Sequence, residues 1–228
     1  MKIELLHNTP LEIADKAISK CWDKCSDEIN LQRIYRVGHK NKHESTLEHI
    51  VYSFDIDGIS RTLLQELARH RIASLSVKST RYTLKELKDE KSFTEKNVYG
   101  EKKAISVHNR QRARKYIVFT GYEDVNTASI WALEELRKIL SLGISNDSAK
   151  YCLPESYKTS LVWTINMRSL RNFIALRSNK SALWEIRLLA NEIYKALPTT
   201  HQFMFVQKLD EQYHGEWERD LIEGLQEW

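Results

Sequence analysis

The stretch "ELARHRIASLSVKSTRYT" at residues 66–83 contains three adjacent basic or imidazole side chains: Arg69, His70 and Arg71. A hydroxyl group and another arginine follow at Ser79 and Arg81. A single arginine at a helix end could simply complement the helix dipole, but that explanation does not account for Ser79 and Arg81. Because a planar guanidinium pairs with phosphate oxygens at two points, we expect this stretch to bind a phosphate-bearing ligand.

The glycine pattern excludes the common loops that hold nucleotide phosphates. All seven glycines are isolated: Gly38, Gly58, Gly100, Gly121, Gly143, Gly215 and Gly224. Neither a G-x-G-x-x-G loop nor a P-loop can therefore form. Side chains and helix ends would have to hold any nucleotide phosphate.

A second polar cluster lies around residue 170: Asn166, Arg168, Asn172 and Arg177. Arg168 and Asn172 are four residues apart, so they share one face of a helix. Each of the two clusters lies next to an apolar strand–helix pattern. We therefore expect the clusters to form two walls of one pocket.

The apolar patterns predict the elements that position both clusters. Every second residue of 50–56 is apolar, which predicts a strand that Gly58 ends. Ser60 is then a suitable N-cap for a helix with inward-facing leucines, and the basic triplet follows that helix. Residues 158–166 predict another strand, whose last residue, Asn166, should cap the short helix that follows.

Other segments have helical patterns. We expect one helix over about residues 106–119 and another from Asp124, as its N-cap, through Leu140, closed by Gly143. A further helix, "SALWEIRLLANEIYKALP", should end before Pro198.

The order of the elements predicts the fold class. Residues 85–103 are charged and predict a loop. Strands and helices are mixed without regular alternation, which indicates an α+β fold. We expect a single compact domain over residues 1–228, with a mostly antiparallel sheet flanked by helices.

The composition is that of a soluble globular protein: 228 residues, 42% hydrophobic, 29% charged and a mean hydropathy of −0.51. No window approaches the ~18 apolar residues of a membrane span, and no segment resembles a targeting signal. The chain has three cysteines, an odd number, so we expect no disulfide framework. We therefore expect a cytoplasmic protein, whose net charge of +4 permits an anionic ligand without implying nucleic acid.

The basic segment "HNRQRARKY" at residues 108–116 allows a different function. Arg110 and Arg114 lie four residues apart on one expected helix face. The simpler interpretation is a solvated surface. The alternative is a docking patch for DNA or RNA, which would make the chain a basic nucleic-acid-binding module.

Two cysteines and two histidines near the N-terminus have a spacing that resembles a zinc site. Cys21-x3-Cys25 followed by His39-x3-His43 lies within the spacing that zinc sites tolerate. The residues between these pairs lack a clear hairpin-and-helix pattern, and both cysteines fall in an amphipathic helix that begins near Leu11. We interpret the spacing as coincidence and expect no metal site.

The stretch "RHRIASLSVKS" at residues 69–79 resembles the RHR-x7-S signature of the flavin-dependent thymidylate synthases. Residues 43–54, "HESTLEHIVYSF", and residues 149–177 are also similar to segments of that family. Together these similarities cover the region from residue 43 to residue 185.

The resemblance implies a compact α+β domain that assembles as a homotetramer, with active sites built from several subunits. It implies FAD as the cofactor, and dUMP, methylenetetrahydrofolate and NADPH as substrates, with dTMP as the product. Neither nucleic acid nor a membrane would be a partner.

The resemblance also implies roles for residues that match the family's motifs. Arg177 would be catalytic. The expected FAD-binding residues are Ser45, Arg69, His70, Arg71, Asn166, Arg168 and Asn172. The expected dUMP-binding residues are Glu66, Arg69, Ser79, Thr80, Arg81, Lys150 and Arg177. The chain departs from the family at Glu66, where glutamine is common, and at Ser76 and Val77, which replace an Asn-Glu pair.

The expected reaction requires C5 of uracil to act as a nucleophile. An enzyme can add a thiolate at C6, or stabilise negative charge on the N3–C4–O4 side, and Arg177 offers the second route. Cys152 is the one cysteine near the expected site, but it is two residues from Lys150, so the two side chains would point in different directions. We expect Cys152 to be a small buried residue and no cysteine to act as the nucleophile.

Overall fold

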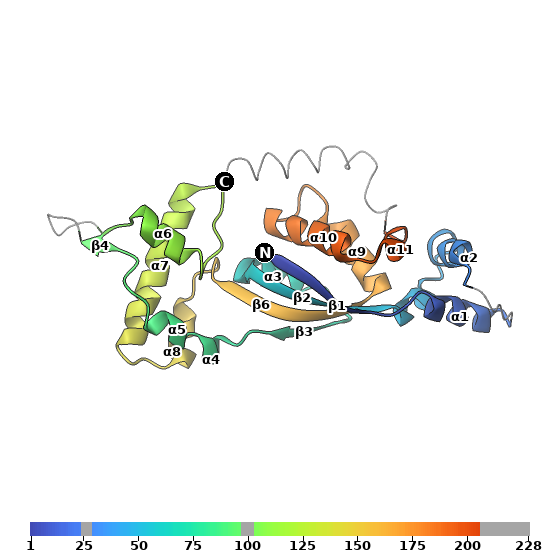
Figure 1. Ribbon diagram of the computed structural model, residues 1–228, viewed down its shortest axis with the longest axis horizontal. Helices are drawn as coiled ribbons and strands as arrows, with labels where there is room; N and C mark the ends of the chain where they lie inside the picture. The colour runs from blue at the N-terminus through green and yellow to red at the C-terminus, as the bar shows by residue number, and fades with distance from the viewer. Residues whose placement is uncertain (24–28, 97–102, 206–228) are drawn as a thin grey trace. The chain divides into compact units, whose positions relative to one another are not determined.

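The computed structural model of the chain describes residues 1–23, 29–96 and 103–205 (Figure 1). The described residues divide into two compact units. The first unit comprises Met1–Asp57, Gln65–Ser76 and the described residues from Leu161 onward. The second unit comprises Gly58–Leu64 and Val77–Ser160. The expectation of a single domain over residues 1–228 stays a prediction.

A four-stranded sheet has the strand order β1-β2-β6-β3. The strands are β1 (Lys2–Asn8), β2 (Val51–Ser60), β6 (Lys158–Asn166) and β3 (Ala73–Val77). β1 pairs antiparallel with β2, from Lys2 opposite Asp57 to Asn8 opposite Tyr52. Together with the flanking helices, this antiparallel sheet confirms the predicted α+β fold.

The strand and helix that precede the basic triplet largely follow the sequence pattern. Tyr52, Phe54 and Ile56 of β2 are fully buried, as their alternation predicts. The prediction that Gly58 ends the strand is wrong, because β2 continues to Ser60 with Gly58 at a φ of 74°. The predicted cap is confirmed: Ser60 Oγ accepts a hydrogen bond of 3.0 Å from the Leu63 N–H at the start of α3 (Arg61–Leu67).

In the first unit, α9 (Met167–Arg177) and α10 (Trp184–Ala196) lie over one face of the sheet (Figure 1). The Trp163 ring of β6 meets the Phe173 ring of α9 edge to face, with centroids 5.0 Å apart. Asn166 caps α9 as predicted, since its Oδ1 accepts a hydrogen bond of 2.8 Å from the Ser169 N–H. α10 ends at Ala196, two residues before Pro198, which also agrees with the prediction.

Short helices complete the first unit: α1 (Glu12–Cys21), α2 (Leu31–Tyr35), a π-helical turn (Arg36–Lys40), a 3₁₀ turn (Glu44–His49) and α11 (Thr199–Gln202). The buried Asp15 of α1 accepts hydrogen bonds of 2.8 and 2.6 Å from the Arg33 guanidinium of α2. This two-point ion pair connects α1 to α2. The predicted helix with both cysteines ends at Cys21, and Cys25 lies outside the described residues.

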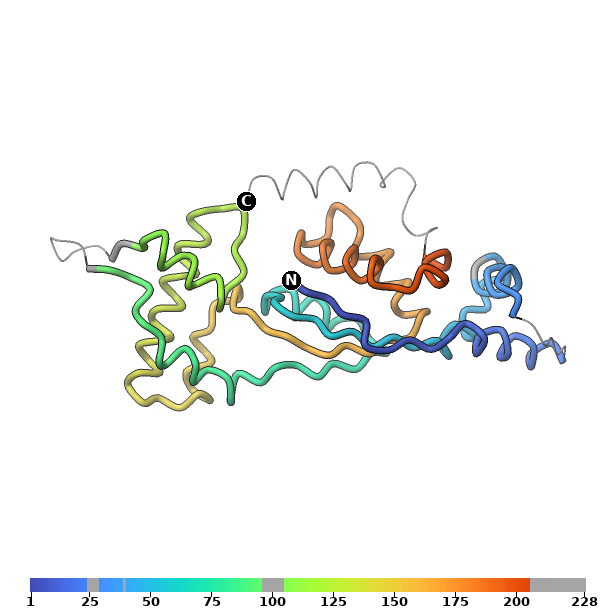
Figure 2. The backbone as a smooth tube through the Cα atoms, viewed as in Figure 1, coloured from blue at the N-terminus to red at the C-terminus, as the bar shows by residue number. Residues whose placement is uncertain are grey.

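The second unit is mainly helical, and its backbone can be followed in Figure 2. Its elements are α4 (Thr80–Thr83), α5 (Lys85–Lys88), β4 (Glu95–Lys96), β5 (Lys103–Ala104), α6 (Val107–Ala113), α7 (Glu123–Ser141), α8 (Asn146–Ala149) and a 3₁₀ turn (Lys150–Cys152). Apolar residues of α7 form the centre of its core: Ile130, Leu133, Leu136 and Leu140. The predicted loop over residues 85–103 is therefore only partly correct, because α5 and β4 lie within it.

Two helix ends in the second unit differ from the prediction. α6 has its predicted start, with Ser106 Oγ accepting from the Asn109 N–H at 3.3 Å, but it ends at Ala113 instead of near residue 119. Asp124 is not the cap of α7, since the helix already includes Glu123. Gly143 follows the helix end with a φ of 82°, as a closing glycine should.

Among the described residues, no helix combines the length and apolarity needed to cross a membrane.

Candidate active site

The basic triplet lies in the turn between α3 and β3. Arg69 and Arg71 are exposed, whereas His70 is buried, with 9% of its surface exposed. The next residue, Ile72, has a φ of 61° and is 76% exposed. A positive φ is unfavourable for a β-branched residue, so the backbone at this turn is strained where it leads from the triplet into β3.

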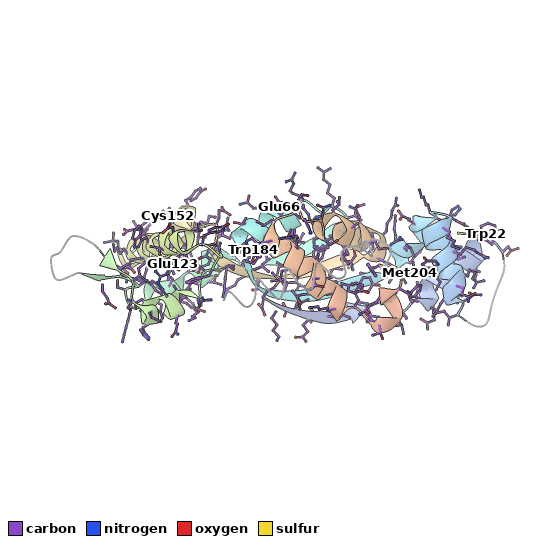
Figure 3. The ribbon with its side chains drawn as sticks, turned by 90° about the horizontal axis from the view of Figure 1, so that it is seen from above. Trp22, Glu66, Glu123, Cys152, Trp184 and Met204 are labelled. Carbon is purple, nitrogen blue, oxygen red and sulfur yellow. The ribbon has the colours of Figure 1, made fainter. Side chains whose placement is uncertain are left out.

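Arg177, at the end of α9, connects the triplet to the second predicted cluster. Its Nε donates to His70 Nε2 at 2.8 Å, and its Nη1 donates to Glu66 Oε2 at 2.8 Å. Its Nη2 donates to the Glu66 backbone carbonyl at 3.3 Å. Figure 3 labels Glu66 on α3. We call Glu66, His70 and Arg177 the Arg177 cluster; all three belong to the first unit.

These contacts determine the protonation of His70. A guanidinium has only donors, so His70 Nε2 must accept and carries no proton. The pKa of His70 is lowered from 6.5 to about 4, first by burial and then by the charges of Arg177 and Arg69, with Glu66 acting in the opposite direction. His70 is therefore neutral at pH 7 with its proton on Nδ1, and its ring meets the Phe173 ring edge to face at 4.9 Å.

Arg168, on α9, lies beside two carboxylates of the 3₁₀ turn. It pairs with Glu48 at 2.6 Å and with Glu44 at 3.4 Å. The neighbouring Arg171 is almost fully buried, lies 3.6 Å from Glu44 and donates to the Gly38 carbonyl. Sequence reasoning missed Glu44, Glu48 and Arg171. The sequence signal that could have indicated them is the pair of glutamates, four residues apart, on either side of the expected site residue Ser45.

The other expected flavin-binding residues of the first unit differ in what their side chains can offer. Ser45 and Asn172 are exposed. Asn166 is half-buried, and its Oδ1 accepts the capping hydrogen bond of α9. Its side-chain amide N–H groups are the donors that it can still offer to a ligand. Exposed hydroxyl, amide and guanidinium donors thus occur on three separate segments of this unit, which fits a large ligand with phosphate groups.

In the second unit, the expected phosphate-binding residues Arg81 and Lys150 lie on either side of one carboxylate. Arg81 Nε is 2.8 Å from Asp147 Oδ1, and Lys150 Nζ is 3.7 Å from the same oxygen. Asn146 Nδ2 also donates to the Arg81 carbonyl at 2.7 Å. Asp147 was missed by sequence reasoning, although its position three residues before Lys150 is a typical helical pair spacing.

Ser79 and Thr80 begin the same α4 segment. The Ser79 side chain is exposed and makes no capping bond to the helix, so its hydroxyl is available to a ligand. Thr80 is half-buried. The Arg177–His70 contact, which lies within the first unit, brings together one residue from each of the two predicted polar clusters.

Three further predictions concern residues outside this site. Cys152 is exposed (Figure 3), so the prediction that it is buried is wrong; the 3₁₀ turn that carries it lies at the surface. Within the described ranges, no group of three metal-ligating side chains occurs; Cys25 and the His39 side chain lie outside those ranges. In the basic segment, Arg110 pairs with Glu123, and the Arg114 guanidinium lies 4.4 Å from the Phe119 ring centroid.

Comparison with known proteins gives a consistent result. The family model described as "Thymidylate synthase complementing protein" matches residues 4–201. A flavin-dependent thymidylate synthase from Wolinella succinogenes is 57% identical over 210 residues, covering 90% of this chain and 97% of that protein. One from Campylobacter jejuni is 54% identical, covering 90% and 96%.

A crystal structure of thymidylate synthase X from Helicobacter pylori, with FAD and dUMP, superposes with a TM-score of 0.85. That chain is 48% identical, and the match covers 92% of this chain and 100% of that one. Fold, family model and sequence identity therefore agree, and the chain belongs to the flavin-dependent thymidylate synthase family.

Proposed function

We propose that the chain makes dTMP from dUMP, with methylenetetrahydrofolate as the one-carbon donor and FAD carrying hydride from NADPH. Family membership supports this function, as does the presence of FAD and dUMP in the Helicobacter pylori structure at 48% identity. The Arg177 cluster is the observation that best supports the proposed roles of the site residues. In it, the expected catalytic arginine donates a hydrogen bond to the expected flavin-binding histidine.

Arg177 acts on the uracil ring as a fixed positive charge. When C5 attacks the one-carbon unit, negative charge develops on the N3–C4–O4 side, and a preorganised cation in a site with little water stabilises it. Three N–H groups of Arg177 are used by His70 and Glu66, which leaves two of the guanidinium's five for the substrate. No thiolate is required for this route.

The flavin, when bound, supplies the hydride chemistry. We assign its binding to residues of the first unit: Ser45, Arg69, His70, Arg71, Asn166, Arg168 and Asn172. The exposed cations fit the pyrophosphate charge, and the Nδ1–H of neutral His70 fits an acceptor atom of the ring system. Arg168 would share its guanidinium between Glu48 and the ligand, since a guanidinium has donors on both edges.

Arg81, Lys150, Ser79 and Thr80 hold the dUMP phosphate in this proposal. The phosphate and Asp147 carry the same sign of charge and would compete for Arg81 and Lys150. Holding the phosphate fixes the uracil ring for reaction. Homotetramer assembly and a cytoplasmic location stay predictions, the first testable by light scattering.

The decisive experiment combines a spectrum with a turnover assay. The purified protein, supplied with FAD, should be yellow, and dUMP should accelerate its oxidation of NADPH while dTMP appears. A colourless protein that forms no dTMP would contradict the proposal. A basic nucleic-acid-binding module would instead bind DNA or RNA in a salt-dependent manner and show no flavin absorbance.

Arg177→Ala tests the catalytic assignment. Loss of one transition-state donor typically costs ~10²–10³ in kcat, and the flavin should remain bound. Lys195→Ala is the control, since it removes a cation from the exposed pair with Glu192 on α10. Turnover of Arg177→Ala within threefold of the control would show that Arg177 is not catalytic.

A further inference from the structure

Arg177 needs an external constraint on its orientation. It is the last residue of α9, and its long, flexible side chain can adopt many rotamers when it has no partner. A catalytic group must be held within about 0.5 Å and 10–20° of its productive geometry. The neighbouring Leu176 is 56% exposed, so packing of α9 alone does not enclose this end of the helix.

Glu66 supplies two of the three contacts that fix the guanidinium. Its carboxylate Oε2 accepts from Nη1 at 2.8 Å, and its backbone carbonyl accepts from Nη2 at 3.3 Å. His70 supplies the third contact at Nε. Contacts at all three nitrogens determine both the position and the plane of the group.

We propose that Glu66 is a positioning residue for Arg177, acting on catalysis through the guanidinium and not through contact with dUMP. This inference rests on the proposed function, in which Arg177 stabilises charge on the uracil ring. It changes the role that the family resemblance implies for position 66, where a glutamine would contact the nucleotide.

The bonding of the Glu66 carboxylate supports this role. One oxygen accepts from Arg177, and the other lies 3.4 Å from Arg69 Nη1. Both oxygens therefore face cations of the protein. A carboxylate has no donor to offer a nucleotide oxygen, and it would repel the dUMP phosphate. A glutamine amide would have neither limitation. Glutamate at position 66, where the family commonly has glutamine, therefore suits a contact with Arg177 better than a contact with dUMP.

Burial makes this contact strong enough to orient a side chain. The side chains of Arg177 and Glu66 are 18% and 30% exposed, so the pair is partly shielded from water. A charge-assisted hydrogen bond is roughly twice as strong as a neutral one. Exposed pairs such as Glu192–Lys195, at 37% and 57%, lack this shielding.

The test compares four variants by kcat, by KM for dUMP and by flavin absorbance: Glu66→Ala, Glu66→Gln, Arg177→Ala and the Glu66→Ala/Arg177→Ala double variant. Glu66→Ala should lower kcat at least ~10-fold, since a misplacement of about 1 Å can cost 10²-fold. KM for dUMP should change less than about threefold. Glu66→Gln keeps an acceptor oxygen and should recover most of kcat.

The double variant gives the sharpest result. If Glu66 acts only through Arg177, adding Glu66→Ala to Arg177→Ala should not lower kcat further. Glu192→Ala is the control and should resemble wild type. If Glu66→Ala does not fold, Glu66→Asp replaces it in the test. Aspartate keeps the negative charge but is one methylene shorter, so its carboxylate lies farther from Arg177. Glu66→Asp should also lower kcat about 10-fold.

Three results would overturn the inference: a kcat for Glu66→Ala or Glu66→Asp within twofold of wild type, a raised KM for dUMP with unchanged kcat, or additive losses in the double variant. The second result would restore the nucleotide-binding role of Glu66. A wild-type protein that binds FAD but makes no dTMP would overturn the proposed function itself, so the two failures are distinguishable.

Discussion

Acidification should destabilise the flavin-free protein, and replacing His70 by glutamine should remove a defined part of that effect. His70 has a pKa of about 4 in the folded chain, lowered by burial, Arg177 and Arg69 and raised only by Glu66. Its pKa in the unfolded chain is about 6.5. Between these values the unfolded state binds more protons than the folded state, so the free energy of unfolding falls as pH falls.

The magnitude follows from the two pKa values. The difference between 6.5 and about 4, at about 1.4 kcal/mol per pKa unit, gives about 3 kcal/mol. This stability is present above about pH 6.5 and fully lost below about pH 4. Glutamine does not titrate, and its side-chain carbonyl can still accept a hydrogen bond from Arg177.

The assay is urea unfolding of wild type and His70→Gln at about pH 7 and again at about pH 4.5. The loss between the two pH values should be smaller in the variant by roughly 2–3 kcal/mol. The buried His201, whose pKa is also lowered by burial, contributes equally to both proteins and cancels. Equal losses in the two proteins would refute the assignment of a neutral, buried His70.

Three further variants give separate tests. Arg81→Ala should raise KM for dUMP much more than it lowers kcat, because a phosphate contact stabilises ground and transition states alike; an unchanged KM would mean that Arg81 does not bind the nucleotide. A variant with Cys21, Cys25 and Cys152 all replaced by serine should keep at least about a tenth of the dTMP formation, since the proposed route uses no thiolate; loss of product with FAD and dUMP still bound would show that a thiol takes part. Ile72→Gly should raise the free energy of unfolding by roughly 1 kcal/mol in urea, because glycine tolerates the φ of 61°; a lower midpoint would contradict this.

The cations proposed to bind ligands mostly have carboxylate partners within the chain. Glu66 pairs with Arg177, Asp147 with Arg81, and Glu48 with Arg168. An entering phosphate must exchange with these carboxylates or share their partners. Ligand binding should therefore depend less on ionic strength than the number of cations alone would suggest, because part of their charge is already neutralised.

Local features could be predicted from the sequence because each depends on neighbours within a few residues. The strand Lys158–Asn166, the Ser60 and Asn166 caps and the closing Gly143 all follow this rule. Asp124 was mispredicted as a cap because several polar residues near a helix start satisfy the same pattern. Gly58 was mispredicted as a strand end because a glycine with positive φ can also lie inside a strand.

The order of the amino acids sets which groups are available to a ligand: it provides the Arg69–Arg71 triplet and Arg177, and it contains no glycine-rich phosphate loop. Which of these groups come into contact depends on how distant segments pack together. Arg177 reaches His70 and Glu66 across more than 100 residues of sequence, and Arg168 reaches Glu48 across 120. With 31 acidic residues in the chain, sequence spacing cannot assign a carboxylate to a distant cation. The packing of α9 against the sheet makes that assignment, and the same burial keeps His70 neutral so that it can accept the hydrogen bond of Arg177.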